Sequence, residues 1–463
     1  METSQTGLRP VNIFQRIDQF DWLILLILIP IFLFIHLETS WVLMILPLFW
    51  GISLLAKNQP INITPINGIM LLLAFQVLVS LYATYDIEIS LPKIAMVLYS
   101  IALFFAFVRL SKQTWGIVAC TAVLGSAGLG IAVLGLFGTN WATTKITILN
   151  PLYELFPKIQ ELIPGLIEGF HPNEVAGAII WVLPVWIALL GWIIVRGKKI
   201  MQYTRLWGYF VLLLVGLLGT ILIGVVLVFT QSRSAYLGFA VGIVLMSFLF
   251  TPRKLKWIFG IFVLVVAGLL IFFILNGQFM IFINSLFPGT GISTTAFSIN
   301  TLSGRVEIWS RAIYAIQDFA FTGMGMNTFR HIVHVLYPLY TVSPDIPIKD
   351  IGHAHNEFLQ SALDLGIPGM IAFISLNISA FWMLFSNMKI LQRRSHRPIS
   401  TRSFLTREIY YAISVGLIGG LFAHFLFGIT DAIALGAKPG VLFWIMLSLA
   451  TSIFMKTQKR DFL

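Results

Sequence analysis

Two histidines separated by one residue, His353 and His355, precede a long apolar stretch of the sequence. Side chains two residues apart cannot share one face of a helix, but they point the same way in an extended segment. A neutral imidazole there can accept a proton from an attacking hydroxyl group. The next residue, Asn356, suits the N-cap position of a following helix and is also a candidate for binding substrate.

Two other interpretations of the histidine pair stay open. The imidazoles could be simple interfacial side chains beside a capping asparagine. They could also begin a zinc site, whose third ligand would come from Glu357, His331 or His334. We favour the catalytic interpretation, because the pair adjoins the longest predicted loop, and we expect no metal ion and no cofactor.

Arginines at two predicted helix starts are candidates for binding an anion. Arg233 lies in a very short turn, 231–234, where an arginine at the bilayer edge must snorkel or pair with an anion. The N–H groups of the helix after it would add to such a site. Arg305 opens an amphipathic segment, where a cation opposes the helix dipole and needs a compensating anion. Arg330 is a weaker candidate of the same kind, and plain solvation is the alternative for each.

Polar residues also stand at the predicted outer start of another apolar stretch, in the run 171–174. We expect Asn173 to cap that helix, with His171 beside it and both near substrate, although simple capping is the alternative. The loop acids Asp86 and Glu88, and Asp431 at the end of a later apolar stretch, give only weak indications of a site.

These residues together indicate one class of reaction. Guanidinium groups bind phosphate oxygens in pairs and stay charged, so Arg233 and Arg305 suit a diphosphate. A histidine suits activation of a hydroxyl group. The combination predicts transfer of a group from a diphosphate carrier to a hydroxyl, and a lipid diphosphate could enter from the side with its tail still in the bilayer.

The composition shows what must position these residues. Of the 463 residues, 58% are hydrophobic and only 11% are charged. A soluble domain has about 25% charged residues, so a soluble enzyme, a disordered chain and a free nucleic-acid-binding protein are excluded. The net charge of +11 fits basic inner loops of a membrane protein. The single cysteine, Cys120, excludes an internal disulfide.

Apolar stretches long enough to cross a bilayer predict an all-α polytopic membrane protein with about twelve transmembrane helices. The predicted spans are 21–37, 39–56, 66–83, 92–110, 115–137, 174–195, 206–230, 234–251, 257–276, 356–385, 409–429 and 439–455. Most Lys and Arg residues then fall on one side, which places both termini in the cytoplasm.

The predicted spans divide the chain into three parts. Residues 1–276 carry the first nine helices, 277–355 form a large external loop, and 356–463 carry the last three helices. A second external segment covers 138–173, and 386–408 is the longest inner loop. Within the large loop, apolar residues recur at helical spacing from Val306 onward, which predicts an amphipathic helix on the membrane or over a cavity.

The same residues resemble the O-antigen ligase superfamily, which includes lipopolysaccharide O-antigen ligases, O-antigen polymerases and protein O-oligosaccharyltransferases. The strongest motif is the run 353–360, followed by Asp364, Gly366 and Gly369. Supporting motifs are the turn 232–234, Gly304-Arg305 with Ile308-Trp309, and the run 171–173.

The resemblance implies a metal-independent glycosyltransferase of GT-C-like fold in the bacterial inner membrane, with its site on the periplasmic face. The donor would be a glycan linked to undecaprenyl diphosphate, held by Arg233 and Arg305. His355 would be the base or would position the acceptor hydroxyl, and His353 would assist it.

The resemblance does not fix the acceptor. Lipid A–core would make the protein a ligase, another glycan a polymerase, and a protein hydroxyl an O-oligosaccharyltransferase. From a different class, a transporter or an accessory protein in inorganic-carbon handling stays open. The concentration of polar residues at one face argues against a transporter, because transporters bind substrate near the midplane.

Overall fold

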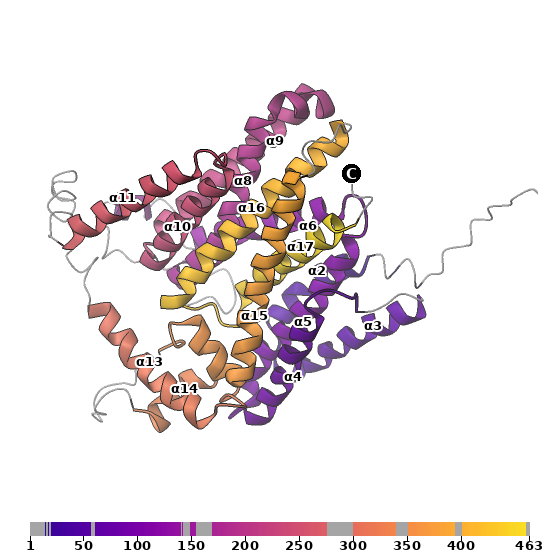
Figure 1. Ribbon diagram of the computed structural model, residues 1–463. Coiled ribbons are helices and arrows are strands. Elements are labelled where there is room, and N and C mark those ends of the chain that lie inside the picture. The colour runs from indigo at the N-terminus through magenta and orange to yellow at the C-terminus, as the bar shows by residue number, and fades with distance from the viewer. Residues whose placement is uncertain are drawn as a thin grey trace, which may run out of the picture.

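The computed structural model describes residues 14, 17, 20–56, 61–139, 141, 149–153, 169–275, 300–338, 351–393 and 401–459 (Figure 1). Within these ranges the chain forms helices and no β-strand. The elements are α2 (Asp21–Leu33), η1 (Leu37–Met44), α3 (Ile45–Leu55), α4 (Asn67–Ala83), α5 (Ile87–Leu110), α6 (Gly116–Gly138), α7 (Asn150–Tyr153), α8 (Pro172–Val195), α9 (Gly197–Phe229), α10 (Arg233–Phe250), α11 (Lys256–Leu275), α13 (Asn300–Asp318), α14 (Phe329–Leu336), α15 (Glu357–Arg393), α16 (Thr401–Thr430), η6 (Lys438–Gly440) and α17 (Val441–Thr457).

Every predicted span falls on a helix, and the prediction of an all-α membrane protein is confirmed. Nine helical stretches among the described residues are long and apolar enough to cross a bilayer. The remaining three predicted spans correspond to shorter apolar helices, namely Asp21–Leu33, Asn67–Ala83 and Lys256–Leu269. The chain is therefore a multi-pass membrane protein, while the count of twelve spans, the GT-C-like arrangement and the three-part division stay predictions.

Helix α16 packs against α8 on one side and against α10 on another (Figure 1). Glycines let their backbones approach closely, as is common in membrane helix pairs. A Cβ atom on Gly420 of α16 would lie 2.0 Å from the carbonyl oxygen of Trp181 in α8. One on Gly238 of α10 would lie 2.3 Å from the carbonyl oxygen of Ala423. The ends of these three helices therefore lie close to one another.

Helix α15 is broken at Gly366, which has φ +72°, so the predicted span 356–385 contains a kink that its apolar composition did not indicate. The break is fixed by the segment after α13. The Ile367 N–H donates to the Ala320 carbonyl at 2.7 Å, and the Met324 N–H donates to the Leu363 carbonyl at 2.7 Å. Helices α13 and α14 thus lie beside the first part of α15 (Figure 1).

Several helices extend beyond the predicted apolar ranges. Helix α9 begins at Gly197 and contains a non-helical residue, Arg205, before its apolar part. Helices α15 and α16 both extend into the predicted inner loop 386–408, because polar residues can continue a helix outside the membrane. The described part of the large external loop, 300–338 and 351–355, is mostly helical, as the spacing predicted.

Candidate active site

The carboxylate of Asp431 is the centre of a polar cluster, and its side chain is 1% exposed. Its Oδ2 atom accepts from the Asn173 amide at 2.7 Å and pairs with an Arg305 nitrogen at 3.4 Å. Its Oδ1 atom accepts from the Ala432 N–H at 3.0 Å. The same atom lies 3.4 Å from His355 Nδ1. Sequence reasoning gave Asp431 little weight, yet it joins residues from α8, α13 and α16 and from the segment before α15.

The histidine pair lies in a loop held in an unusual backbone conformation. His355 has φ +49°, in the left-handed region that few non-glycine residues adopt. Its N–H donates to His353 Nδ1 at 3.0 Å, and the two rings are 4.4 Å apart. The imidazoles therefore lie side by side, as an extended segment predicted, although the loop has a tight turn rather than a straight path.

The protonation of His353 follows from these contacts. Because Nδ1 accepts a hydrogen bond, the proton of the neutral ring is on Nε2, which lies 3.6 Å from Asp431 Oδ1. Burial, and then the neighbouring His355, lower the pKa of His353 to about 3, although Asp431 acts in the opposite direction. His353 is therefore neutral near pH 7, with its protonated Nε2 atom facing the Asp431 carboxylate.

His355 is oriented differently, with its Nδ1 atom toward Asp431. When Nδ1 carries the proton and donates it to Asp431, Nε2 is left with a lone pair. The side chain is 24% exposed, so Nε2 is the nitrogen available to a substrate. Trp309 of α13 fixes the backbone here, because its indole N–H donates to the His355 carbonyl at 3.3 Å.

Burial raises the pKa of the Asp431 carboxyl, but the hydrogen bond from His355 and the charges of His353, His355 and Arg305 outweigh it. The net result is a pKa below the usual value for an aspartate. Asp431 is therefore an ionised, buried acceptor near neutral pH.

Asn356 caps α15 as predicted. Its side-chain oxygen accepts from the N–H groups of Phe358 and Leu359 at 3.0 and 2.9 Å. Its amide nitrogen donates to the Ile429 carbonyl at the end of α16, at 2.9 Å. Both ends of the side chain are thus in use, and Asn356 joins the start of α15 to the end of α16 beside Asp431.

The prediction that Asn173 caps α8 is wrong. The cap is His171, whose Nδ1 accepts from the Asn173 N–H at 3.3 Å. Pro172 suits the first helical position, so the helix begins two residues earlier than expected. The Asn173 side chain is therefore available to bind Asp431, and the charge of His171 acts on His353.

Arg305 is not at the start of its helix, because α13 begins at Asn300. Its compensating anion is Asp431, which lies 126 positions away in the sequence. Burial lowers the pKa of Arg305, Asp431 opposes this effect, and the positive charge of Arg233 lowers it further. Arg233, the first residue of α10, therefore lies within electrostatic reach of Arg305. On the same helix, Arg311 pairs with Glu307, four residues earlier, at 2.7 Å.

Lys93 of α5 is a charged residue that sequence reasoning missed. It interacts electrostatically with Asp364, Arg330 and Glu174, and its charge also acts on His353. Arg330 of α14 therefore lies within electrostatic reach of Lys93. A lysine inside a predicted span could have indicated this, because charges in such segments usually face a polar interior.

The side chains of His353, His355 and Asp431 offer ligand atoms within 4.8 Å of one another. The third member of this set is Asp431, not Glu357, whose carboxylate lies 3.2 Å from His424 Nε2. His331 and His334 are not members of it. Arg305 already neutralises the same carboxylate, which opposes binding of a divalent cation beside it.

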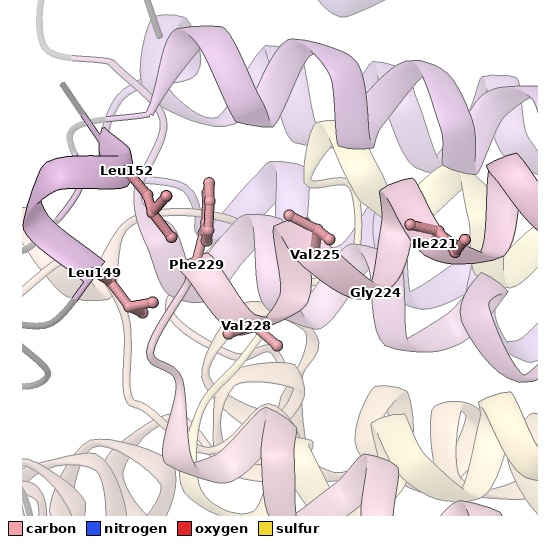
Figure 2. A pocket seen from close by; sticks show the side chains of 7 residues that line it. All are labelled: Leu149, Leu152, Ile221, Gly224, Val225, Val228 and Phe229. Atoms are coloured by element: carbon pink, nitrogen blue, oxygen red, sulfur yellow. The ribbon is translucent and has the colours of Figure 1, made fainter. Parts of the chain in front are cut away.

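An apolar cavity of about 570 Å³ lies near Arg233, at the end of α9 (Figure 2). It is lined by Leu149, Leu152, Ile221, Gly224, Val225, Val228 and Phe229. Beside the lining residue Phe229, the Tyr153 hydroxyl donates to the Phe229 carbonyl at 3.0 Å and accepts from the Gln231 amide at 2.7 Å. The last lining residue, Phe229, thus stands four positions before Arg233 in the sequence.

The fold and this cluster define a multi-pass helical membrane protein with a polar site where α8, α10 and α15 begin and α16 ends. Residues 218–374, about a third of the chain, match the family model described as O-antigen ligase. This match supports the resemblance to the O-antigen ligase superfamily that the sequence predicted, whose members are glycosyltransferase-like membrane enzymes. The matched part includes Arg233, Arg305 and His355 but not Asp431. No curated protein matches the chain.

Proposed function

We propose that the protein transfers a glycan from an undecaprenyl-diphosphate carrier to an acceptor hydroxyl, without a metal ion and with inversion at the anomeric carbon. The observation that carries this proposal is the convergence of His353, His355 and Arg305 on Asp431. An imidazole and a guanidinium group are the two groups that such a transfer needs.

In the proposed reaction, the acceptor oxygen attacks the anomeric carbon from the side opposite the diphosphate. A new carbon–oxygen bond forms as the bond to the diphosphate oxygen breaks, and the acceptor proton moves to Nε2 of His355. Asp431 orients the ring through Nδ1 and stabilises the imidazolium that results. Such general base catalysis contributes about 10²–10⁴-fold in rate.

Arg305 and Arg233 would stabilise the negative charge that grows on the leaving diphosphate. Fixed cations aimed at developing charge are among the largest contributions to enzyme catalysis. The two side chains lie within electrostatic reach of each other, so that one diphosphate could interact with both. They would thus do the work that a divalent cation does in other glycosyl transfers.

The apolar cavity supports a lipid-linked donor. Its lining is entirely apolar in side-chain type, and it ends beside the Gln231–Arg233 turn. In this proposal the first part of the polyprenyl tail lies in the cavity between the α7 region and α9, and the diphosphate lies at Arg233 (Figure 2). The remaining tail would stay in the bilayer.

We place the protein in the bacterial inner membrane, with both termini in the cytoplasm and the Asp431 cluster on the periplasmic face. The lipid or glycan acceptor, lipid A–core included, would approach from that face. Replacing Cys120 by serine gives a cysteine-free background, since the chain has one cysteine. Single cysteines at Lys198 and Gly352 should then react with a membrane-impermeant thiol reagent only from the cytoplasmic and the periplasmic side, respectively.

The decisive experiment reconstitutes the protein in proteoliposomes with an undecaprenyl-diphosphate-linked glycan and, in turn, lipid A–core, a second lipid-linked glycan, or an acceptor protein. The product identifies a ligase, a polymerase or a protein O-oligosaccharyltransferase. His355→Ala should abolish transfer, while His396→Ala, at a position predicted for the inner side, should not. Transport of a solute with no transfer to any acceptor would contradict the proposal.

A further inference from the structure

Below the histidine loop lies a buried pair of polar side chains, Gln360 and Asp364, which the proposed reaction does not use. Both lie on the first part of α15, before its break, and are 2% and 0% exposed. The Gln360 side-chain oxygen accepts from the Ala354 N–H at 2.9 Å. Ala354 is itself fully buried and lies between the two histidines.

Asp364 fixes which way the Gln360 amide faces. Its Oδ1 atom accepts from the Gln360 side-chain nitrogen at 2.9 Å and from the Asn327 N–H at 3.0 Å. The Ala354 N–H can only donate, so the oxygen of Gln360 must face Ala354 and its nitrogen must face Asp364. Asn327, with φ +66°, is in turn joined to α5 by a bond from its amide to the Ile89 carbonyl at 3.3 Å.

The position of Ala354 matters because of its two neighbours. His355 adopts a positive φ, and such a backbone persists only where surrounding contacts hold it. The hydrogen bond from the His355 N–H to His353 Nδ1 spans Ala354. A movement of the Ala354 N–H would therefore shift both imidazoles relative to Asp431.

We propose that Gln360 and Asp364 are positioning residues, which hold Ala354 so that His353 and His355 both face Asp431. This inference rests on the proposed function of the histidine loop. It also means that the contacts with α5 and with the segment before α14 help to align the histidine loop. Neither residue contacts the substrate in this scheme.

The test replaces Gln360 by methionine, which has a similar shape but no hydrogen-bonding groups. Losing a buried partner of this kind costs enough to lower kcat about 10- to 100-fold, with KM for the lipid-linked donor nearly unchanged. The matched control is Gln392→Met, on the same helix, where the side chain bonds only the Tyr411 hydroxyl at 3.1 Å at an exposed site. That variant should keep full activity.

Asp364 offers a test that separates positioning from charge. In Asp364→Asn the side-chain oxygen can still accept from both Gln360 and Asn327, so kcat should remain within a few-fold of the native value. In Asp364→Leu both bonds are lost, and kcat should fall as in Gln360→Met. A large loss in Asp364→Asn, equal to that in Asp364→Leu, would refute positioning through hydrogen bonds.

A second readout does not depend on transfer activity. In protein with isotope-labelled histidine, NMR near neutral pH should show His353 with its proton on Nε2, assigned by comparison with His353→Asn. In Gln360→Met this fixed form should be replaced by a mixture of both neutral forms, while Gln392→Met leaves it unchanged. An unaltered His353 signal in Gln360→Met overturns the inference even if transfer is never observed. A shifted signal without any transfer would instead contradict the proposed function alone.

Discussion

Replacing Asp431 by asparagine is the most direct test of the cluster, because the shape is kept and the charge is removed. In the native protein its Oδ2 atom accepts from Asn173 and Arg305, and its Oδ1 atom accepts from Ala432 and faces His355. An asparagine offers one oxygen and one NH₂ group. If the oxygen keeps the Ala432 and His355 contacts, the NH₂ group faces two other donors.

The magnitude follows from these contacts. A buried donor left without its acceptor costs about 1–3 kcal/mol, and more where a charge is involved. Asn173 and Arg305 would both lose their acceptor, so we expect a loss of about 2–5 kcal/mol in the free energy of unfolding. The Arg305 part lies at the low end, because that side chain is 23% exposed.

The substitution should also lower kcat, independently of its effect on the free energy of unfolding. Without the carboxylate, the imidazolium form of His355 loses its stabilising partner, and a charged hydrogen bond of this kind is worth about 1.5–3 kcal/mol. We therefore expect kcat to fall about 10- to 100-fold at saturating donor. The assay measures initial rates in proteoliposomes, at a temperature where circular dichroism shows the variant to be folded. An Asp431→Asn protein with native kcat would refute the proposed role of the carboxylate.

Four further predictions concern the same site and its support. Arg233→Lys and Arg305→Lys should each lower kcat about 10-fold or more, measured in the same vesicles, because a lysine lacks the planar fork. Chelator should leave the rate unchanged, and a loss restored by a divalent cation would contradict metal independence. The pKa of His353 is about 3 in the folded protein and about 6.5 in the unfolded chain, so its contribution to stability is complete above pH 6.5 and is lost as the pH falls toward 3. The unfolding temperature should thus decrease less steeply with acid in His353→Gln. Gly366→Ala should cost about 1–3 kcal/mol of stability in thermal unfolding, because its Cβ atom would lie 2.2 Å from the Phe321 carbonyl oxygen.

The sequence predicted the helices well because an apolar run of bilayer length has few other structures open to it. It did not predict where these helices end or break. The break in α15 depends on Ala320 and Phe321, which lie on a different element and give no periodic pattern in the sequence. Hydropathy identifies only the part of a helix that lies within the membrane. It therefore did not predict the polar start of α9 at Gly197.

The site was predicted only in part, because the sequence shows which residue types are present but not which of them are in contact. Histidines and arginines at helix starts indicated a diphosphate and a hydroxyl. Asp431 was undervalued because its partners, Asn173 and Arg305, lie 258 and 126 positions away. Asn173 was assigned the capping role that His171 performs, because both residue types can accept from a helix N–H.

The charges around Asp431 determine how its buried carboxylate interacts with Arg305 and with the histidine pair. Asp431 is ionised although burial disfavours it, because the surrounding groups that stabilise it are positive or donate hydrogen bonds. Arg305 pairs with Asp431 and also lies within electrostatic reach of Arg233. A diphosphate that interacts with both guanidinium groups would draw Arg305 toward it. The Asp431 carboxylate would then interact more strongly with the Nδ1–H of His355, which orients the ring toward the acceptor. Binding of the donor and activation of the acceptor would thus be linked through one carboxylate.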